Sequence, residues 1–439
     1  MWRVVLCCGA CVCAVGCVSS GTWSAYREIE RELAEERAAP PPRRSGEAAT
    51  CNEIATQIAE AFPRLRAGRH RARAALARAR SEAALPAPEL MLEVWDLPIG
   101  DLALADREGM YMAGVAQAFP PAGALEGRAR AAVERAEEAL AEVSDAERAI
   151  RARALGACVE WSASHLEIAR YREAEAIAER MREAVSARVP SAAASISELA
   201  RVDAELARVR RMRVESEVRA SRAAAWLRAW LGSDVPATPP SIEPPSTVDG
   251  LEAQVSRALE RRGTLRAARA RARAAASMAD AAQAEASVPT FMVEATYMQM
   301  PSARPGVGAA IGMTLPWLWS GEGAARDAAR AEEDAALEEV AALELEVRAE
   351  IGEAAASVES LRRALAELRE RERPAAERAL EAVTAGLSTG AVDVTAWLDA
   401  ARALRELEVD EAGLLRELAM AWIELESASG ARICGCIGQ

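Results

Sequence analysis

Few residues in this sequence have the types and spacing that catalysis requires. The two histidines, His70 and His165, lie far apart, and neither has a serine or cysteine nucleophile in a recognisable context. His70 occupies a position at which a second, similar segment has Ala270, and His165 stands alone in a long helical stretch. The sequence also lacks a Gly-rich phosphate loop and an HExxH pair. We therefore expect no enzyme, no metal site and no cofactor.

The cysteines indicate a lipid anchor instead. Five of the nine cysteines lie within residues 1–17, where Arg3 precedes an apolar run over residues 4–16. A run of roughly 13 residues is too short to cross a bilayer as a helix, but it suits a signal peptide. The run ends in the sequence AVGC, residues 14–17, which resembles a lipobox. We expect a signal peptide over 1–16 and lipid on Cys17; an ordinary cysteine-rich signal peptide is the alternative.

The residues beyond this cysteine predict where the protein is sorted. Position 18 is Val and not the Asp that commonly retains lipoproteins at the inner membrane, so we expect the outer membrane. Cys51, Cys158, Cys434 and Cys436 remain, which is no disulfide framework. Cys434 and Cys436 lack further ligands nearby and make a weak metal site, so we favour a loose C-terminal tail.

Composition narrows the class of protein further. Apolar residues make up 51% of the 439 residues but aromatic ones only 4%, which favours closely packed Ala-rich helices. The net charge of −13 argues against nucleic acid as a partner, because binding to phosphates needs a basic surface. Arg-rich runs such as residues 69–80 are therefore interpreted as solvated helix faces.

A tandem duplication organises the chain. LRAGRHRARAA, which begins at Leu65, differs at two of eleven positions from LRAARARARAA, which begins at Leu265. Further matches follow in the same order: PELMLEV from Pro88 with PTFMVEA from Pro289, and Glu126-Gly127 with Glu322-Gly323. The period is too long for a solenoid, so the chain consists of two structural repeats.

Each repeat is expected to contain a helix, two short strands, a very long helix, a tight turn and a returning helix. We assign a flexible tether to 17–50, the first repeat to 51–232, a Pro- and Ser-rich linker to 233–250, the second repeat to 251–430 and a tail to 431–439. The turns, or hairpin tips, are placed at 186–195 and 384–393. The long helices run for about 90 Å, which is typical of coiled-coil hairpins rather than of a compact globule.

The four predicted strands have the length and alternation of membrane strands. They cover 89–96, 110–119, 290–299 and 307–316, each near the ten residues or so that cross a bilayer when tilted. Apolar residues such as Leu90 and Leu92 alternate with residues such as Glu93, as in a barrel with an apolar outer face. Soluble hairpins that cap the helices are the alternative. Four strands cannot close a membrane barrel and lipid tolerates no open edge, so several chains would have to share one.

The ordered set of segments resembles the TolC family of outer-membrane efflux proteins, especially the lipoprotein members that pair with resistance–nodulation–division pumps. LPAPELMLEV (85–94) resembles the start of the first strand in that family. FPPAG (119–123) and IGMTLPWLWSGEG (311–323) resemble the two exits from the strands into the long helices. Residues 373–425 resemble the second helical hairpin, with Gly390 and the 398–400 segment at recognisable positions.

The resemblance implies a fold, a function and partners. The fold is mainly α-helical: a homotrimer in which each chain gives four strands to one outer-membrane β-barrel and its helices to a long periplasmic α-helical barrel. The function is that of an exit duct that lies in outer-membrane lipid. The duct works with a periplasmic adaptor and an inner-membrane efflux pump. A soluble periplasmic coiled-coil adaptor or scaffold is the alternative, but it leaves four strands of membrane length unexplained.

The candidate site residues lie at the hairpin tips and on the strands. Ala192, Gly386 and Gly390 make the tips small and flexible, so that the coiled coil of an adaptor could approach, and Pro190 lies in the first tip. Asp399 would form an acidic ring around a trimer axis, or is an ordinary exposed helix residue; both interpretations stay open. Many family members have a second acidic residue where this chain has Ala396. The sequence therefore does not decide whether an acidic gate operates here.

Two strand residues are expected to face the inside of the barrel. Glu93 and Glu294 would make its mouth acidic and mildly favour cations. This does not decide between metal ions and drugs as the exported substrate.

Overall fold

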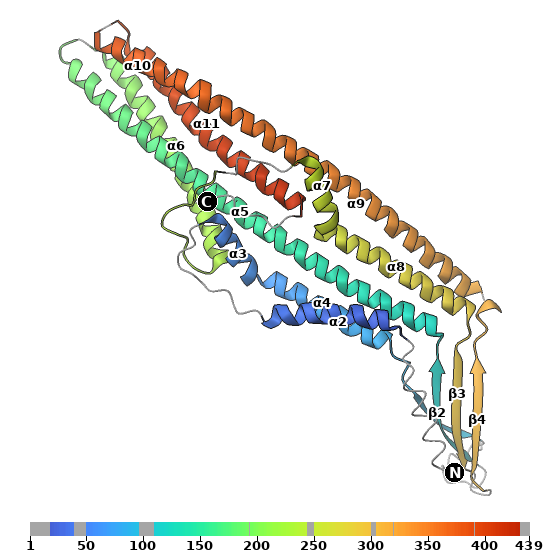
Figure 1. The fold of residues 1–439 in the computed structure, drawn as a ribbon. Coiled ribbons are helices and arrows are strands. Elements are labelled where there is room, and N and C mark those ends of the chain that lie inside the picture. The colour runs from blue at the N-terminus through green and yellow to red at the C-terminus, as the bar shows by residue number, and fades with distance from the viewer. Residues whose placement is uncertain are drawn as a thin grey trace. The chain divides into compact units, whose positions relative to one another are not determined.

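The computed structural model describes residues 18–38, 50–95, 109–192, 194–243, 250–299, 304–318, 320–389 and 391–430. Helices make up most of the described chain, and four strands form one antiparallel sheet (Figure 1). The predicted fold class, a mainly helical chain that contributes four strands, is confirmed. No described helix is long and apolar enough to span a membrane.

The elements follow each other in two similar series. The first contains α2 (Ser20–Ala38), α3 (Cys51–Ala61), α4 (Pro63–Glu82), β1 (Glu89–Trp95), β2 (Met110–Phe119), α5 (Ala122–Arg188) and α6 (Ile196–Leu231). The second contains α7 (Leu251–Arg261), α8 (Gly263–Ser287), β3 (Phe291–Gln299), β4 (Gly306–Met313), η1 (Pro316–Leu318), α9 (Ser320–Glu367), η2 (Leu368–Glu372), α10 (Arg373–Thr389) and α11 (Val394–Ala428).

The chain divides into two compact units, which are described separately. The sheet unit comprises Met1–Ala39, Ala67–Val143 and Thr264–Leu343 and contains all four strands. The hairpin unit comprises Pro40–Arg66, Ser144–Gly263 and Glu344–Gln439 and contains both hairpin tips.

Local sequence signals set several helix boundaries. Thr50 caps α3 and Ser195 caps α6, each in a capping box with the Glu three residues later. Gly232, with a φ of 71°, ends α6 in the left-handed conformation that glycine adopts without strain. Pro63 interrupts what the sequence suggested was one helix, because the residue before a proline disfavours the helical conformation.

A widened turn joins α9 to α10. The segment η2 is a π-helical turn, in which the N–H of Arg373 donates to the carbonyl of Leu368. Pro374 lies two residues after the end of η2. Proline has no N–H and its ring clashes with the carbonyl four residues earlier, so a wider turn lets the helix continue past it.

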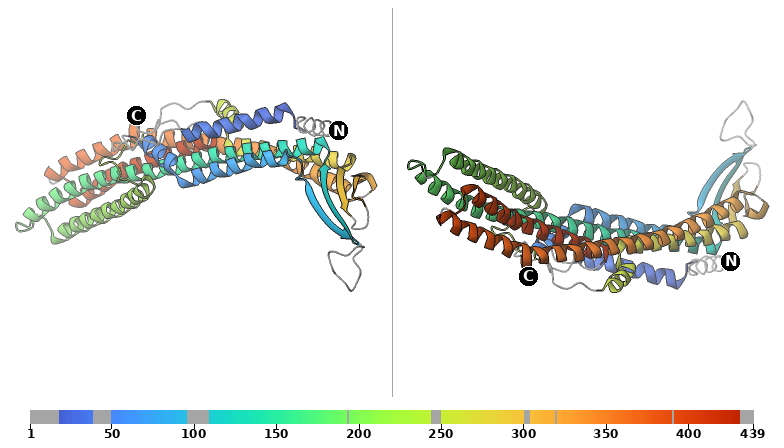
Figure 2. Two further views of the ribbon diagram at one scale, coloured as in Figure 1. Left: turned by 90° about the horizontal axis from the view of Figure 1, so that it is seen from below. Right: turned by 90° about the horizontal axis from the view of Figure 1, so that it is seen from above.

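The four strands pair in the order β1-β2-β3-β4, with every pair antiparallel. Figure 2 gives two further views of the ribbon. The register aligns residues in rows; one such row is Glu89, Ala116, Glu294 and Ala310. Neighbours within a row point to the same face of a sheet. One face therefore carries Leu90, Leu92, Val293 and Ile311, and the other carries the glutamates.

A small apolar core holds the N-terminal helix of the sheet unit. Its buried residues come from α2, α4 and α5: Tyr26, Ile29, Leu33, Ala72, Leu76, Ala79, Ala132, Val133, Ala136 and Leu140. The flexible tether expected for this region is thus wrong over Ser20–Ala38. The spacing of Tyr26, Ile29 and Leu33 gives α2 an apolar stripe, and the core buries that stripe.

Helices α5 and α8 approach each other closely in the same unit. A Cβ atom at Gly127 would lie 2.6 Å from the carbonyl oxygen of Ser277, so only glycine fits there. Ion pairs flank the contact: Glu137 with Arg266 at 2.7 Å and Glu134 with Arg273 at 2.8 Å.

A disulfide bond joins α3 to α5 in the hairpin unit. Cys51 and Cys158 are both buried and lie 107 residues apart in the sequence. The cysteine pattern predicted no disulfide framework, and it did not indicate this single bond. The pairing depends on the approach of two helices, which spacing along the chain does not reveal.

Candidate functional site

The first hairpin tip lies between α5 and α6. Pro190 and Ala192 are exposed there, and Ala192 has a φ of 58°. It is the one non-glycine residue with a positive φ among the described residues. This conformation costs an alanine roughly 1–2 kcal/mol, so the turn carries local backbone strain. Ile196, the first residue of α6, exposes 76% of its surface at the same tip.

The second tip lies between α10 and α11. The carbonyl of Gly386 accepts the N–H of Ala391 at 2.9 Å and the hydroxyl of Thr389 at 3.0 Å. The side chain of Val392 occupies the space that a Cβ of Gly386 would need, so the glycine serves the turn itself. Gly390 lies outside the described residues, and so do Cys17, Cys434 and Cys436.

The two hairpins pack against each other near their tips. A buried cluster joins them: Val185 from α5, Val202 from α6, and Val394, Trp397 and Leu398 from α11. The indole N–H of Trp397 also donates to the hydroxyl of Thr384 at 3.1 Å. The residues after the turns therefore fix the mutual position of the two hairpins within this unit.

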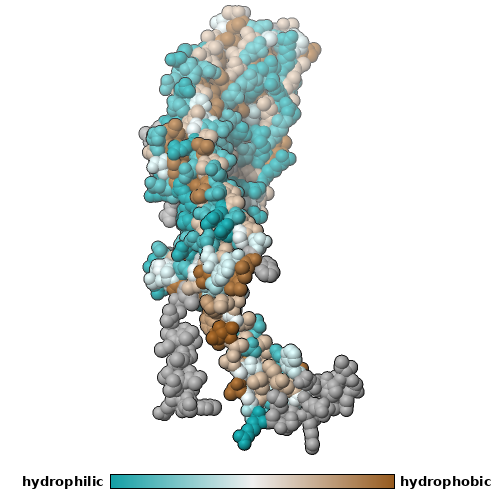
Figure 3. Space-filling view, turned by 90° about the vertical axis from the view of Figure 1, so that its right-hand side faces the viewer, coloured by the Kyte–Doolittle hydropathy of each residue, from teal (hydrophilic) through white to brown (hydrophobic). Residues whose placement is uncertain are grey.

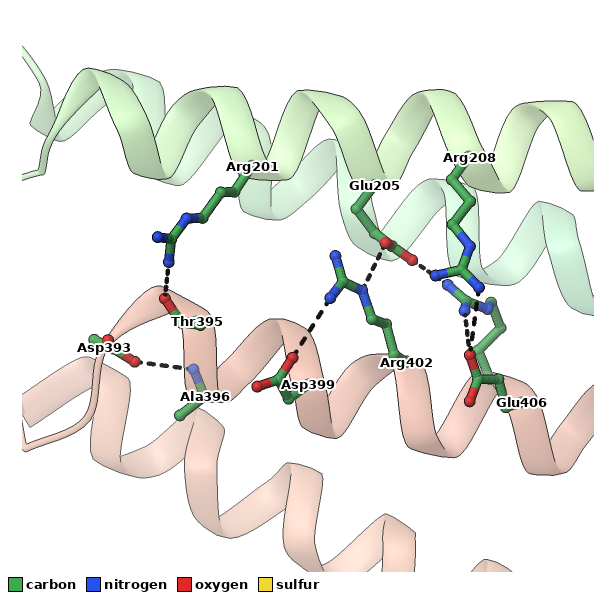
Figure 4. A network of polar contacts seen from close by, with 10 residues as sticks. Arg201, Glu205, Arg208, Asp393, Thr395, Ala396, Asp399, Arg402 and Glu406 are labelled. Atoms are coloured by element: carbon green, nitrogen blue, oxygen red, sulfur yellow. Dashed lines mark hydrogen bonds and ion pairs between the residues drawn. The ribbon is translucent and has the colours of Figure 1, made fainter.

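A buried polar network adds to this contact (Figure 4). Glu205 of α6 accepts a hydrogen bond from Arg402 Nε of α11 at 2.7 Å and another from Arg405. Glu205 and Arg405 are 5% and 4% exposed. Closer to the tip, Arg201 donates to the hydroxyl of Thr395 at 2.7 Å.

The network keeps its carboxylate charged. Burial alone raises the pKa of Glu205, but the hydrogen bonds and charges of Arg402 and Arg405 outweigh it, and the pKa is lowered. This network was not predicted from the sequence. Its members come from helices about 200 residues apart in sequence, and each looks like an ordinary charged helix residue.

Asp399 stands at the edge of the network. Its side chain is 68% exposed and pairs with Arg402 of the same helix at 3.5 Å. Position 396, where many family members have a second acidic residue, is Ala396 in this chain. Asp393 caps α11 by accepting the N–H of Ala396 at 2.9 Å.

The two glutamates proposed for the barrel interior share one face of the sheet. Glu93 accepts the indole N–H of Trp95 at 2.7 Å, and Glu294 accepts the hydroxyl of Thr296 at 3.0 Å. The opposite face is apolar and exposed; Leu90, Leu92 and Ile311 are 70%, 74% and 79% exposed. Figure 3 shows the contrast with the helices, which carry far more of the hydrophilic colour than the strands do.

No cluster of three or more His, Cys, Asp or Glu side chains in the described part of the chain is placed to hold a metal ion.

Comparison with known proteins relates this geometry to a family. Residues 254–431 match the family model described as outer membrane efflux protein. No curated protein sequence matches the chain.

Solved structures of outer-membrane channels share the fold. The outer-membrane channel OprN is 19% identical with a TM-score of 0.74, over 91% of this chain and 96% of that chain. VceC from Vibrio cholerae is 18% identical with a TM-score of 0.74, over 88% and 97% of the two chains. The MtrE outer membrane channel of Neisseria gonorrhoeae, in its open state, is 18% identical with a TM-score of 0.67, over 87% and 89%.

These similarities agree with the architecture of the chain. The family model covers the second repeat, and the first repeat contains similar elements in a similar order. The solved channels share the fold along most of both repeats. The second repeat therefore matches the outer membrane efflux protein family, and the chain as a whole shares the fold of the solved outer-membrane channels.

Proposed function

We propose that this protein is the outer-membrane exit duct of a tripartite efflux pump, a passive conduit that works as a homotrimer with a periplasmic adaptor and an inner-membrane pump. The observation that carries the proposal is the exposed apolar face of the sheet, on which Val307 and Ile311 are 85% and 79% exposed. Water disfavours such a face and lipid favours it. A soluble coiled-coil adaptor or scaffold would have no use for it.

The sheet also requires more than one chain. Within the described residues, β1 and β4 each pair with one strand only, so the sheet has two open edges. Backbone groups at an open edge would be unsatisfied in lipid, at a cost of several kcal/mol each. Pairing β4 of one copy with β1 of the next would close the edges, and three copies make the barrel that the family resemblance implies.

The duplication supports the same conclusion in the helices. Five positions along one stripe of α8 are buried: Ala267, Ala270, Ala274, Ser277 and Ala281. The positions 200 residues earlier form the same stripe on α4, and all five are exposed: Ala67, His70, Ala74, Ala77 and Ser81. The α4 stripe thus lacks the cover that α5 gives to its counterpart on α8.

The missing cover for the α4 stripe is the second-repeat counterpart of α5, which is α9. Gly127 of α5 touches α8, whereas its counterpart Gly323 of α9 has no side chain or other helix within 4 Å of a built Cβ. Ala141 of α5 is buried, while Leu337 at the equivalent position of α9 is 55% exposed. We infer that α9 of one copy packs on α4 of the next, as α5 packs on α8 within one chain.

Cysteine cross-linking tests this arrangement. Ala77 corresponds to Ser277, which touches Gly127, so Gly323→Cys combined with Ala77→Cys should form a disulfide between copies. In a Cys434→Ser, Cys436→Ser background, mild oxidation of outer membranes should give covalent dimers and trimers on a non-reducing gel. Gly323→Cys with Ala79→Cys is the matched control, because Ala79 is buried inside its own chain. Equal cross-linking in both variants, or none in the first, would contradict the trimer.

The hairpin tips are the surface that we propose for the adaptor. Both turns are short, their ends are exposed, and a buried cluster and polar network hold the hairpins behind them. Lipid on Cys17 would add an anchor at the other end of the sequence. The amino acids after Cys17 are tied down, because Ser19 bonds to Glu126 of α5.

A further inference from the structure

Methionines are concentrated on one face of the sheet. Five of the twelve methionines in the chain lie there: Met91, Met110, Met112, Met292 and Met298. On the opposite face of the four strands, Met313 is the one methionine. We call the first five the thioether face.

The register brings these residues together across strands. Met112 of β2 is aligned with Glu93 of β1 on one side and with Met298 of β3 on the other. Directly aligned residues have Cβ atoms about 4.5–5.5 Å apart. Met91 is two residues from Glu93 on the same face, and Met110 is two residues from Met112. The row therefore offers two thioethers beside a carboxylate, with two more thioethers in the rows next to it.

This face is the one that would line the duct. The other face is apolar and exposed and suits lipid, so the thioether face points inward if the sheet forms a barrel. Its polar side chains include Glu89, Glu93, Glu294 and Thr296. Polar residues are expected on the wet side of a membrane strand, and methionine is not one of them. Its abundance there needs a chemical reason.

Small residues on β4 leave room beside the side chain of Met298. Cε of Met298 lies 3.5 Å and 3.6 Å from the built Cβ positions of Gly306 and Gly308 on β4. Met298 thus lies across a strand that has no side chains at these two positions. An unbranched thioether with room around it can turn toward Met112 or away from it.

We propose that the thioether face is a transient binding surface for soft monovalent metal cations, Cu(I) and Ag(I), as they pass through the duct. Thioether sulfur is a soft ligand that selects Cu(I) over hard cations. The glutamates supply the negative charge that draws a cation into the lumen. Conduction needs several weak sites rather than one tight site, and five methionines in each of several copies provide them. The inference rests on the proposed duct.

Binding of silver ions by purified protein tests the proposal. The protein carries Cys434→Ser and Cys436→Ser, so that free thiols do not bind the metal, and silver nitrate is titrated calorimetrically in chloride-free detergent buffer. Met91, Met112 and Met298 are replaced together by Leu, which has nearly the same volume and no sulfur. The matched control replaces Met212, Met313 and Met420, which lie off the thioether face, by Leu.

We expect the first triple variant to bind silver at least tenfold more weakly than the parent protein, and the control to bind as the parent does. The proposal is overturned if the parent binds no silver, or if both triple variants lose the same affinity. Conductance of potassium nitrate in planar bilayers, measured on the same preparations, separates this result from the duct. Parent protein that conducts potassium but binds no silver refutes the metal inference alone, whereas protein that never conducts refutes the duct.

Discussion

The backbone N–H of Ser19 donates to a carboxylate oxygen of Glu126 at 2.7 Å. The Ser19 and Thr22 hydroxyls donate to the other oxygen, at 2.8 Å and 2.7 Å. The start of α2 is thereby tied to the beginning of α5.

Replacing Glu126 by Ala should release α2. Three donors near the N-terminus lose their acceptor, while the core around Tyr26 keeps part of the contact. We expect trypsin to cut after Arg27 several-fold faster in the variant. Glu322→Ala removes the corresponding carboxylate of the second repeat, and its cleavage rate at Arg27 should match the parent protein. No difference between the two variants would show that Glu126 does not hold this segment.

The same carboxylate predicts a dependence on pH. Burial raises the pKa of Glu126, but hydrogen bonds from Ser19, Thr22 and Arg130 more than offset this, and the pKa is lowered to about 2. A lowered pKa stabilises the folded segment above the ordinary value of 4.5, and this contribution is lost as the pH falls from 4.5 toward 2. It amounts to at most about 3 kcal/mol, because solvent screens a carboxylate that is only partly buried. Hydrogen exchange of α2 should therefore accelerate in this range in the parent protein but not in Glu126→Gln.

The polar network of the hairpin unit predicts a leak. Glu205→Gln leaves Arg402 and Arg405 without their shared counter-charge, and removing one partner of a buried ion pair costs about 3–5 kcal/mol. If the hairpin tips form the periplasmic entrance, loosening them should raise the conductance of the reconstituted channel. Glu406→Gln is the control, because Glu406 is 55% exposed and such pairs contribute only about 0–1 kcal/mol. Equal conductance in both variants would show that the network does not hold the hairpin tips together.

The disulfide predicts sensitivity to reductant. Cross-linking residues 107 apart restricts the unfolded chain, which the loop-closure estimate values at about 4–5 kcal/mol. Reduction, or the Cys51→Ser, Cys158→Ser double variant, should lower the thermal midpoint of the helical signal in circular dichroism. Reductant should have no effect on the double variant. A parent protein whose midpoint is the same with and without reductant would contradict a structural role for the bond.

The two faces of the sheet should respond differently to a charge. Ile311→Arg places a guanidinium on the face proposed for lipid and should cost about 2–4 kcal/mol at mid-membrane. Thr296→Arg places the same group on the opposite face and should be much milder. The measurement is denaturant-induced unfolding of the protein in lipid vesicles. Equal losses in the two variants would mean that the apolar face does not meet lipid.

The exposed apolar residue at the first tip predicts an adaptor contact. Ile196→Asp removes apolar surface without harming α6, because an acidic residue is favourable in the first turn of a helix. We expect efflux in cells to fall while the amount of protein in the outer membrane stays constant. Ser197→Asp adds the same charge one residue later and should leave efflux unchanged. Full efflux in the Ile196 variant would exclude this residue from the docking surface.

Periodic features were accessible from the sequence and tertiary ones were not. Alternation such as that of Leu90, Leu92 and Glu93 predicts β strands because side chains on a strand change face at every residue. The strand β4 nevertheless ends at Met313, before the 3₁₀ turn that begins at Pro316. A run of alternating residues does not show where pairing stops.

The contacts that sequence reasoning missed join residues far apart in the chain. Glu205 and Arg405, like Cys51 and Cys158, meet only because helices pack, and no local pattern marks them. The methionines are a different case. Met91, Met112 and Met298 follow the same alternation as the glutamates. If residues are sorted only by polarity, however, methionine is counted with the apolar residues of the other face.

The contrast between Gly127 and Gly323 bears on the order of biogenesis. An added methyl group at Gly127 would overlap the Ser277 carbonyl within the same chain. Gly127→Ala should therefore impair the folding of the single subunit, before any second copy binds. The same change at Gly323 has open space around it in a single chain and should become harmful only when a second copy docks. Two identical substitutions would then stop maturation at different stages, one at the folded subunit and one at the assembled ring. Of the two duplicated helix contacts, the one at Gly127 would thus depend on the folding of a single chain, and the one at Gly323 on the concentration of folded copies in the membrane.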